Sequence, residues 1–385
     1  MFSRNIAIAR ETEVCLPFAL SLAHVFTPSS WEISMPDLSP ETLRAHSVNP
    51  RQFIDAMPST LADGQRILHV YNTSGLHFTI LPDRGMDIFT AHYNGLPLTW
   101  ISQNAPHSPD YGSAWLRQFN GGLLTTCGYT HVGPPERDTL TGEQRDLHGN
   151  ATRLKATDVA VTVTDNTLTI RALMSENRLF GEQLQIERVY RLTLGVPTIT
   201  IEDTVTNKGD MPCPLMVLYH FNVGYPLVRG GTQLHASSNV LPRDAAAQPG
   251  LSDWMNYHAP EVGYAEQVFY HQCKTHNGDT QVVLANDDLA LALSWDTTHS
   301  PYFTQWKNTR QGVYVSGIEP GNCVPEGQNS ARQHERLIML QPNETHHFRN
   351  TLTVAHQPEQ IAAMKQNVQT LNETGVLVER FGITA

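Results

Sequence analysis

The sequence predicts an all-β protein, a large antiparallel β-supersandwich with an N-terminal elaboration and a C-terminal helix. Along most of the chain, apolar and polar residues alternate over short segments, which is the period of a half-buried strand. Turn-forming residues interrupt these segments at spacings of roughly 8–12 residues, as in a sandwich. The chain has 26 glycines and 24 prolines to supply those turns. Its length of 385 residues fits either two domains or one large β-architecture.

The first part of the chain differs in texture from the rest. Residues 1–60 are assigned to an N-terminal elaboration packed on the main domain, which covers residues 61–385. Residues 39–47 begin with Ser-Pro before a polar periodic run, a pattern typical of a helix start. Residues 49–57 are expected to form a second short helix. Residues 14–26 are apolar, but the preceding glutamates, an internal proline and the missing cleavage site do not favour a secretory signal.

Strands are expected from about residue 66 onward. Residues 66–102 alternate between the turn sequences Asn-Thr-Ser-Gly, Pro-Asp-Arg-Gly and Tyr-Asn-Gly, which predicts three strands. Helical periodicity returns only at residues 357–371. Further alternating strands are expected over residues 152–175, 184–209, 281–296, 312–320 and 346–356.

Charge and cysteine content argue against several classes of protein. The net charge is −11 and basic runs are absent, so binding to nucleic acid is not expected. No stretch reaches the ~18 apolar residues of a transmembrane helix, so no membrane partner is expected. The five cysteines are widely spaced without a C-x-x-C pair, which argues against disulfides or a zinc site and favours a reducing cytoplasm. Monomer and homodimer are both compatible with the sequence.

Several stretches combine strand context, glycine and polar side chains. In residues 81–88 (LPDRGMDI), Arg84 lies in a glycine turn between two aspartates, where it forms either a local ion pair or a donor to ligand hydroxyls. Asn120 precedes a Gly-Gly pair, which indicates a bulge or a close backbone approach. Trp306 lies in a strand pattern and is either a core residue or an apolar face for a sugar ring.

Two histidines and one glutamate are candidates for proton transfer. His220 follows an apolar strand in the sequence YHFNVGYP, and either forms hydrogen bonds within the core or faces a pocket. His148 precedes a glycine at an expected strand start. Glu319 is expected at a strand end before a Pro-Gly turn, where a carboxylate is either solvated or acts as a general base. The motifs G-x-S-x-G and H-E-x-x-H, which mark serine nucleophiles and zinc helices, are absent.

Four short motifs, in order along the chain, resemble those of the aldose 1-epimerases (galactose mutarotases) and their hexose-6-phosphate mutarotase relatives. NGGLLTTCG is similar to their R-G-G-I-P-x-C-W-P segment, and DLHGNATR to L-H-G-G and H-G-F-A-R. LYHFNVGYP resembles N-H-x-Y-F-N-L, and GIEPGN resembles L-E-P or L-E-T. The similarity spans roughly residues 66–357. The occurrence of both LPDRGMDI and GIEP in one chain most resembles an uncharacterised subgroup of this superfamily, a domain of unknown function.

The resemblance implies a galactose mutarotase-like β-sandwich that interconverts sugar anomers by acid–base ring opening, without a metal or organic cofactor. His220 takes the place of the family's general acid and Glu319 that of the general base. His148 takes the place of a histidine that binds a sugar hydroxyl. Phe221 and Asn222 are expected to support His220 by packing and hydrogen bonding, and Asn222 is also counted among the substrate-binding residues.

Two positions depart from the family pattern. Asn120 stands where the family has a basic residue before the glycine pair, so Arg84 or Arg117 is expected to supply the cation. Asp244 is the candidate match for the family's substrate-binding aspartate. The implied partner is a small sugar or sugar derivative, and Arg84 or Lys307 would bind a phosphate or acid substituent if the sugar carries one.

Two other functions stay open on the same scaffold, because a fold does not determine a function. One is a carbohydrate-binding protein without catalysis. The other is a lyase or glycoside hydrolase, for which Tyr225 and Arg84 could be recruited. Convergence of His148, His220 and Glu319 on one pocket would favour the mutarotase.

Overall fold

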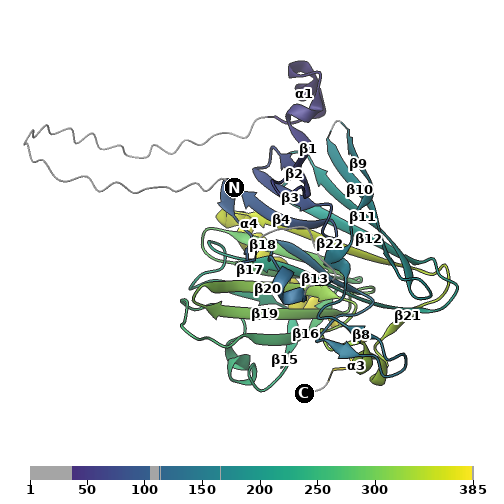
Figure 1. Cartoon of the computed structure of the whole chain (residues 1–385). Helices are drawn as coiled ribbons and strands as arrows, with labels where there is room; N and C mark the ends of the chain where they lie inside the picture. The colour runs from purple at the N-terminus through teal and green to yellow at the C-terminus, as the bar shows by residue number, and fades with distance from the viewer. Residues whose placement is uncertain (1–36, 105–111, 113, 165, 384–385) are drawn as a thin grey trace, which may run out of the picture. The chain divides into compact units, whose positions relative to one another are not determined.

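The computed structural model describes residues 37–104, 112, 114–164 and 166–383. Strands dominate these residues, and neighbouring strands pair antiparallel in three large sheets and one two-stranded ribbon (Figure 1). The all-β prediction is therefore confirmed. The ribbon consists of β7 (Glu136–Arg137) and β8 (Gln144–Arg145).

The first sheet has five strands in sequence order, separated by the turns that the sequence indicates. Between the last two strands, Asn94 and Gly95 adopt φ angles of 50° and 80°, the left-handed pair that a two-residue hairpin turn requires. The strands are β1 (Ile54–Thr60), β2 (Arg66–Asn72), β3 (Leu76–Leu81), β4 (Asp87–Tyr93) and β5 (Leu96–Pro97).

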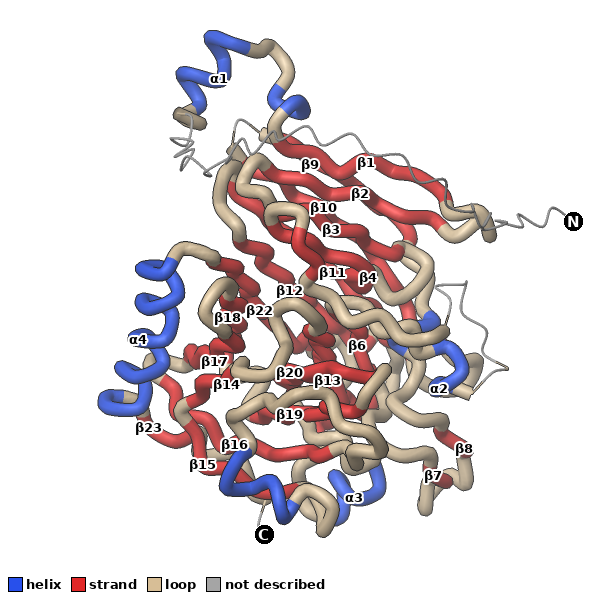
Figure 2. The backbone as a smooth tube through the Cα atoms, turned by 90° about the vertical axis from the view of Figure 1, so that its left-hand side faces the viewer, coloured by secondary structure: helices blue, strands red, loops and turns tan. Residues whose placement is uncertain are grey.

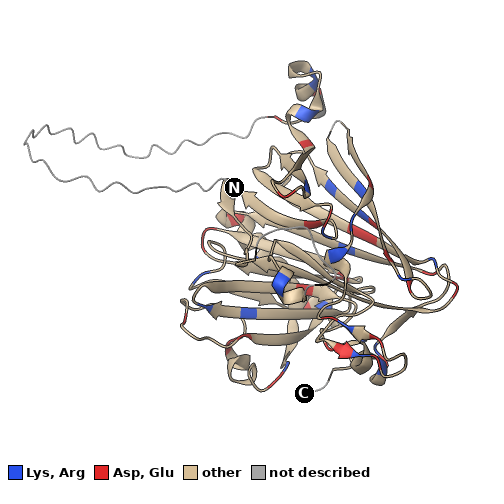
Figure 3. Cartoon of the chain, viewed as in Figure 1, with Lys and Arg blue, Asp and Glu red and all other residues tan. Residues whose placement is uncertain are grey.

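The second sheet has eight strands, and its long members alternate between more and less buried positions as the sequence predicts. On the outer face, Arg171 pairs with Glu187, and Arg191 with Glu202, and Figure 3 shows basic and acidic bands side by side on these strands. In spatial order the strands are β14 (Gln233–Ala236), β17 (Asp279–Ala285), β18 (Ala290–Asp296), β22 (Thr345–Ala355), β12 (Thr198–Asn207), β11 (Gln183–Thr193), β10 (Thr167–Asn177) and β9 (Thr157–Val163).

The third sheet is covered on both faces, and its central strands are buried almost without interruption. Its main path in spatial order is β15 (Ser238–Pro242), β16 (Gln267–Thr275), β19 (Tyr302–Arg310), β20 (Val313–Gly321), β13 (Cys213–Val223) and β21 (Ile338–Leu340). Two further strands join it, β6 (Leu124–Tyr129) beside β13 and β23 (Val376–Leu377) beside β16.

The three sheets share one hydrophobic core. A single cluster of buried side chains includes Ile54 of β1, Ile186 of β11 and Phe221 of β13. Figure 2 shows the five-stranded sheet alongside β9–β11, with β13, β19 and β20 next to β17, β18 and β22. This arrangement leaves the far face of the third sheet to be covered by loops, and those loops form the candidate site described below.

A buried ion-pair network ties strands of all three sheets together. The guanidinium of Arg188 on β11 bonds Asp203 on β12 through two N–H groups, at 2.7 and 2.6 Å. Its other N–H groups donate to Asp87 on β4, to the carbonyl of Gly85 and to the hydroxyl of Thr126 on β6. All five donors of Arg188 are thus satisfied, as a fully buried guanidinium requires.

Helices are few and peripheral among the described residues. The longest, α4 (Pro358–Thr374), confirms the helix expected over residues 357–371 and packs Ile361 and Val368 against β17, β18 and β22. The others are α1 (Pro40–His46), α2 (Trp115–Gln118), α3 (Gln328–Gln333) and the 3-10 turns η1 (Pro50–Gln52), η2 (Ala151–Arg153) and η3 (Gln248–Asp253).

Two expectations for the N-terminal part meet the structure differently. The helix expected over residues 39–47 is confirmed as α1, in which the Ser39 hydroxyl accepts a bond from the backbone N–H of Thr42. The helix expected over residues 49–57 is wrong. Only η1 forms there, and β1 begins at Ile54 because it pairs with β2 along its whole length. The first sheet thus includes residues 54–60, which the sequence assigned to the N-terminal elaboration, and residues 1–36 lie outside the described residues.

Candidate active site

A cavity of about 590 Å³ lies on the third sheet. His220 of β13, Trp306 of β19, Glu319 of β20 and the loop residue His148 all line it, so these four sequence-predicted residues come together. The other lining residues are Trp100, Ser102, Gln103, Asn104, Trp115, Leu116, Phe119, Gly133, Pro134, Leu147, Arg243, Glu266, Val268, Thr304, Val313 and Pro325.

The strand register sets His220 beside Glu319. β13 and β20 pair with Leu218 opposite Gly321 and Phe221 opposite Ile318, so His220 lies across from Glu319. Directly opposite residues in an antiparallel pair have their side chains on the same face and in contact distance. The ladder is interrupted between the Leu218–Gly321 and Phe221–Ile318 pairs, where Pro320 has no N–H to donate.

Neither His220 nor Glu319 stands at a strand end, and this corrects the sequence prediction. β13 continues to Val223, and β20 continues through Pro320 to Gly321. The Pro-Gly turn expected after Glu319 does not form, because β20 stays paired with β19 through both Pro320 and Gly321. The candidate acid and base are therefore held by continuous strands, which are more rigid than loop ends.

The His220–Glu319 pair is buried and close. The imidazole Nε2 lies 3.0 Å from Oε1 of Glu319, but the contact lacks hydrogen-bond alignment, since Oε1 has no hydrogen-bond partner among the described residues. Burial lowers the pKa of His220 to about 4 and raises the pKa of Glu319 well above its usual range. Because desolvation penalises both charged forms, the free protein favours neutral imidazole beside a protonated carboxyl.

His148 enters the cavity from a constrained loop, not from the strand start that the sequence predicts. Its φ is 55°, in the left-handed region that residues with a Cβ rarely adopt. The loop is held on both sides, because the His148 N–H donates to the Gly133 carbonyl and its carbonyl accepts from the Gly128 N–H. Burial lowers the pKa of His148 to about 3, so this imidazole is neutral at physiological pH.

Aromatic rings form the walls of the cavity. Trp115 stacks on Phe119 with ring centroids 4.6 Å apart, and Phe119 meets His220 edge-on at 5.8 Å. On the other side of His220, Trp306 lies at 5.4 Å and contacts Trp100 at 6.0 Å. Such rings offer apolar surface to the C–H faces of a sugar while fixing the orientation of the imidazole.

Several buried polar atoms at this cavity lack partners within the described part of the chain. They belong to residues that line it: Nδ1 of His148, Nδ1 of His220, Oγ1 of Thr304 and Oε1 of Glu319. Buried polar atoms in native proteins are almost always hydrogen-bonded. Four open positions at one cavity therefore call for a ligand with several hydroxyl groups, or for ordered water in its place.

Three residues expected to bind substrate do not line the cavity. Arg84 is buried and donates to the backbone carbonyl of Gln118, 2.8 Å away. Asn222 donates to the carbonyls of Gly122 and His220, so it supports His220 as expected but does not face the ligand space. Asn120 is buried outside the lining residues.

The remaining expected contacts also lie elsewhere. Arg117 is exposed on α2 and does not line the cavity. Asp244 is exposed, outside the lining residues, and accepts a 2.8 Å hydrogen bond from Nε of Arg243. Lys307 donates to the carbonyl of Asp253, and Tyr225 is 69% exposed, so neither reaches the cavity.

Sequence reasoning missed Arg243 and Glu266 and the aromatic residues Trp100, Trp115 and Phe119. Arg243 stands directly before Asp244 in the bend that follows β15, and it lines the cavity whereas Asp244 does not. Glu266 stands just before β16 in no recognisable motif. Glu266 reaches the cavity because of where β16 lies in the third sheet, which no local sequence pattern indicates.

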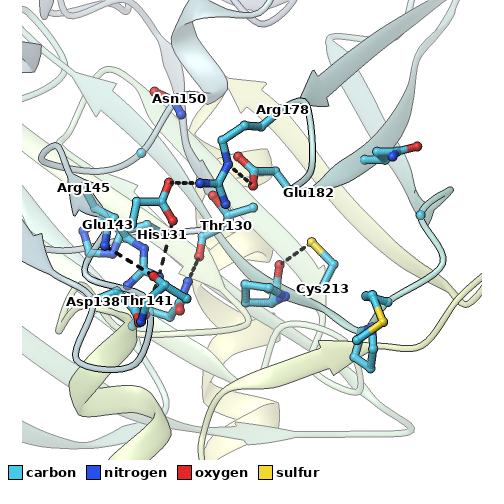
Figure 4. A pocket seen from close by; sticks show the side chains of 18 of the residues that line it. Thr130, His131, Asp138, Thr141, Glu143, Arg145, Asn150, Arg178, Glu182 and Cys213 are labelled. Atoms are coloured by element: carbon cyan, nitrogen blue, oxygen red, sulfur yellow. Dashed lines mark hydrogen bonds and ion pairs between the residues drawn. The ribbon is translucent and has the colours of Figure 1, made fainter.

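A larger hollow of about 850 Å³ lies away from these residues (Figure 4). Its charged side chains neutralise one another: Arg178 pairs with Glu182 and Glu143, and Arg145 pairs with Asp138 at 2.5 Å. Most of the charged side chains of this larger hollow are thus already paired, and of its lining residues His131 has a buried ring nitrogen, Nδ1, without a hydrogen-bond partner among the described residues, against four such atoms in the smaller cavity.

No group of three or more His, Cys, Asp or Glu side chains in residues 37–383, apart from the gaps stated above, is arranged to hold a metal ion. No helix in the same part of the chain is both long enough and apolar enough to cross a membrane.

Solved structures of similar fold include proteins described as aldose 1-epimerases or galactose mutarotase-like. A candidate aldose 1-epimerase from Klebsiella pneumoniae subsp. pneumoniae is 28% identical, with a TM-score of 0.77 over 86% of this chain and 91% of that one. A galactose mutarotase-like protein from Clostridium acetobutylicum is 14% identical, with a TM-score of 0.57 over 80% of this chain and 100% of that one. The galactose 1-epimerase of Lactobacillus acidophilus is 13% identical, with a TM-score of 0.53 over 79% and 98%. The last two comparisons bear on the fold alone.

No curated protein matches the chain. The family model described as "Domain of unknown function (DUF4432)" matches residues 62–354, which covers all three sheets except the edge strands β1 and β23 and the end of β22. The chain therefore belongs to the DUF4432 family, an uncharacterised group with the galactose mutarotase-like β-sandwich fold.

Proposed function

We propose that this protein is an aldose 1-epimerase-like isomerase, which interconverts the anomers of a sugar by acid–base ring opening. The observation that carries the proposal is the buried His220–Glu319 pair, 3.0 Å apart, in an aromatic cavity with unpartnered polar atoms. The small-molecule sugar would stack on the tryptophan faces and supply the missing hydrogen bonds. A reducing cytoplasm stays the expected location, in keeping with the four described cysteines, which are buried and unpaired.

In the proposed reaction, Glu319 as carboxylate removes the proton from the anomeric hydroxyl and His220 as imidazolium donates a proton to the ring oxygen. The bond between C1 and the ring oxygen breaks while C1 becomes an aldehyde carbon. The C1–C2 bond rotates, and reclosure returns both protons by the same groups with their roles reversed. The 3.0 Å separation of Nε2 and Oε1 places the two groups next to each other, and a proton passes between them only once their hydrogen bond is aligned.

The proposal predicts catalysed mutarotation with a bell-shaped pH dependence. The pair has to carry one proton, so activity should fall below about pH 4, where His220 gains a second proton and no base remains. Activity should also fall at high pH, as Glu319 loses the only shared proton through its raised pKa. Polarimetry of freshly dissolved α-anomers of several aldoses measures both limbs.

The same assay separates this function from its alternative. A sugar that binds by calorimetry, without any acceleration of its mutarotation at any pH, would identify a carbohydrate-binding protein and reject the enzyme. The lyase reading has less support, since neither Tyr225 nor Arg84 lines the cavity.

Gly317 is expected to be necessary for placing the acid–base pair. It precedes Glu319 by two residues on β20, and a methyl group there would lie 2.4 Å from Oε1 of Glu319 and 3.2 Å from Cε1 of His220. Gly317→Ala should therefore lower kcat by about 10²-fold, the cost of a displacement near 1 Å at reacting groups. Thermal unfolding, measured with the kinetics, should change far less.

Gly230→Ala is the matched control, because a Cβ at Gly230 meets its nearest neighbour at an ordinary 3.4 Å. Wild-type kcat in Gly317→Ala, alongside wild-type kcat in the control, would show that the pair does not depend on this space.

A further inference from the structure

We propose that Arg243 and Glu266 form the specificity-determining pair of the cavity, and that they select a sugar with uncharged vicinal hydroxyl groups over one with a phosphate or carboxylate. The inference rests on the proposed function in taking a sugar as the ligand. It adds which residues recognise the sugar away from the anomeric carbon and which substituents they reject.

Arg243 is the one lysine or arginine among the described residues that line the cavity. It follows β15, and Glu266 precedes β16, the strand paired with β15, so both lie at the same end of the sheet. The positive charge of Arg243 acts on the reacting pair, because it opposes the burial that raises the pKa of Glu319. Arg243 is thus near the chemistry without being part of it.

Glu266 links the cation to the aromatic wall. Its Oε2 accepts a 2.8 Å hydrogen bond from the indole N–H of Trp306, and its Oε1 lies 3.7 Å from the guanidinium of Arg243. The carboxylate therefore fixes the plane of Trp306, against which a sugar ring would stack, and also presents an acceptor beside the donors of Arg243.

The charges around this position do not suit an anion. Arg243 pairs with Asp244 at 2.8 Å as well as with Glu266, so one cation faces two carboxylates. The other cations considered for a phosphate, Arg84 and Lys307, donate to backbone carbonyls away from the cavity. A phosphate arriving at Arg243 would meet Glu266 at short range, and such like-charge contact is a common means of rejecting a ligand.

A pair of neighbouring hydroxyls fits the same position well. Each hydroxyl both donates and accepts, so one can accept from the guanidinium of Arg243 while its neighbour donates to Glu266. About a third of the Arg243 side chain and half of the Glu266 side chain are exposed, so solvent screens their charges. We therefore expect discrimination of about tenfold rather than complete exclusion.

The test compares neutral hexoses with hexose 6-phosphates and uronic acids on the full-length protein, by calorimetric binding and by polarimetric mutarotation. The wild type should favour the neutral sugars by about tenfold in Kd and in kcat/KM. Glu266→Gln removes the repelling charge but keeps an acceptor for Trp306, so it should reduce this preference to near unity, chiefly by tightening the binding of the charged sugars. Glu261→Gln, an exposed glutamate that does not line the cavity, is the matched control.

Each outcome decides the inference. Equal or tighter binding of the charged sugars by wild type overturns it, as does a preference that Glu266→Gln leaves unchanged, and so does the binding of no sugar of either kind. Selective binding of neutral sugars without accelerated mutarotation supports the specificity pair and rejects only the proposed catalysis.

Discussion

Replacing Glu319 with glutamine should reduce mutarotation to near the uncatalysed rate, a loss of about 10²–10⁴-fold in kcat. The amide cannot accept the proton of the anomeric hydroxyl, whereas its size and shape match those of the carboxyl. Burial raises the pKa of Glu319 well above its usual range, so a neutral side chain of the same shape suits the site and the fold should be retained. Polarimetry or NMR exchange, with thermal unfolding alongside, measures both effects.

Glu187→Gln is a suitable control for that experiment, since Glu187 is a strand glutamate on the outer face of the second sheet and is paired with Arg171. It should leave kcat unchanged. Wild-type exchange by Glu319→Gln, on a sugar that the wild type turns over, would remove Glu319 from the mechanism and with it the assignment as a mutarotase.

The largest effect on stability is expected from Arg188→Met. The substitution leaves the carboxylates of Asp87 and Asp203 buried without their cation, and breaking a buried pair in this way costs about 3–5 kcal/mol. Tyr219, the neighbour of His220 on β13, also donates to Asp203, so the loss should loosen the strand that carries the candidate acid. Urea unfolding followed by circular dichroism measures the free energy of unfolding.

Arg191→Met offers a control on the same strand. Arg191 pairs with Glu202 at 2.9 Å, but both side chains are substantially exposed, so its loss should cost less than about 1 kcal/mol. Similar free energies of unfolding for the two variants would contradict the role given to the buried network. A triple variant that replaces Arg188, Asp87 and Asp203 by neutral side chains of similar volume should recover part of the loss, because no unpaired charge remains buried.

Local patterns predicted the strands well, because alternation and turn residues act over a few neighbouring positions. The helix predicted over residues 49–57 was wrong because a contact distant in sequence decided the structure there. The pairing of β1 with β2 overrides a weak local helical preference. The turn predicted at Pro320 was wrong for a similar reason. On one side Pro320 pairs with β19, and on the other side the ladder with β13 is interrupted at Pro320 and resumes beyond it.

The sequence by itself determined the fold class, many of the strand positions and the identity of His148, His220, Glu319 and Trp306 as residues of interest. It did so because the strand period is local and the motif order follows the chain. Only the tertiary structure decided which polar residues share the cavity: Arg84, Asn120, Asn222 and Asp244 are excluded, and Arg243 and Glu266 are included. The physical reason is that facing a cavity depends on strand register and on which sheet covers which face. Both are set by contacts between residues far apart in the chain.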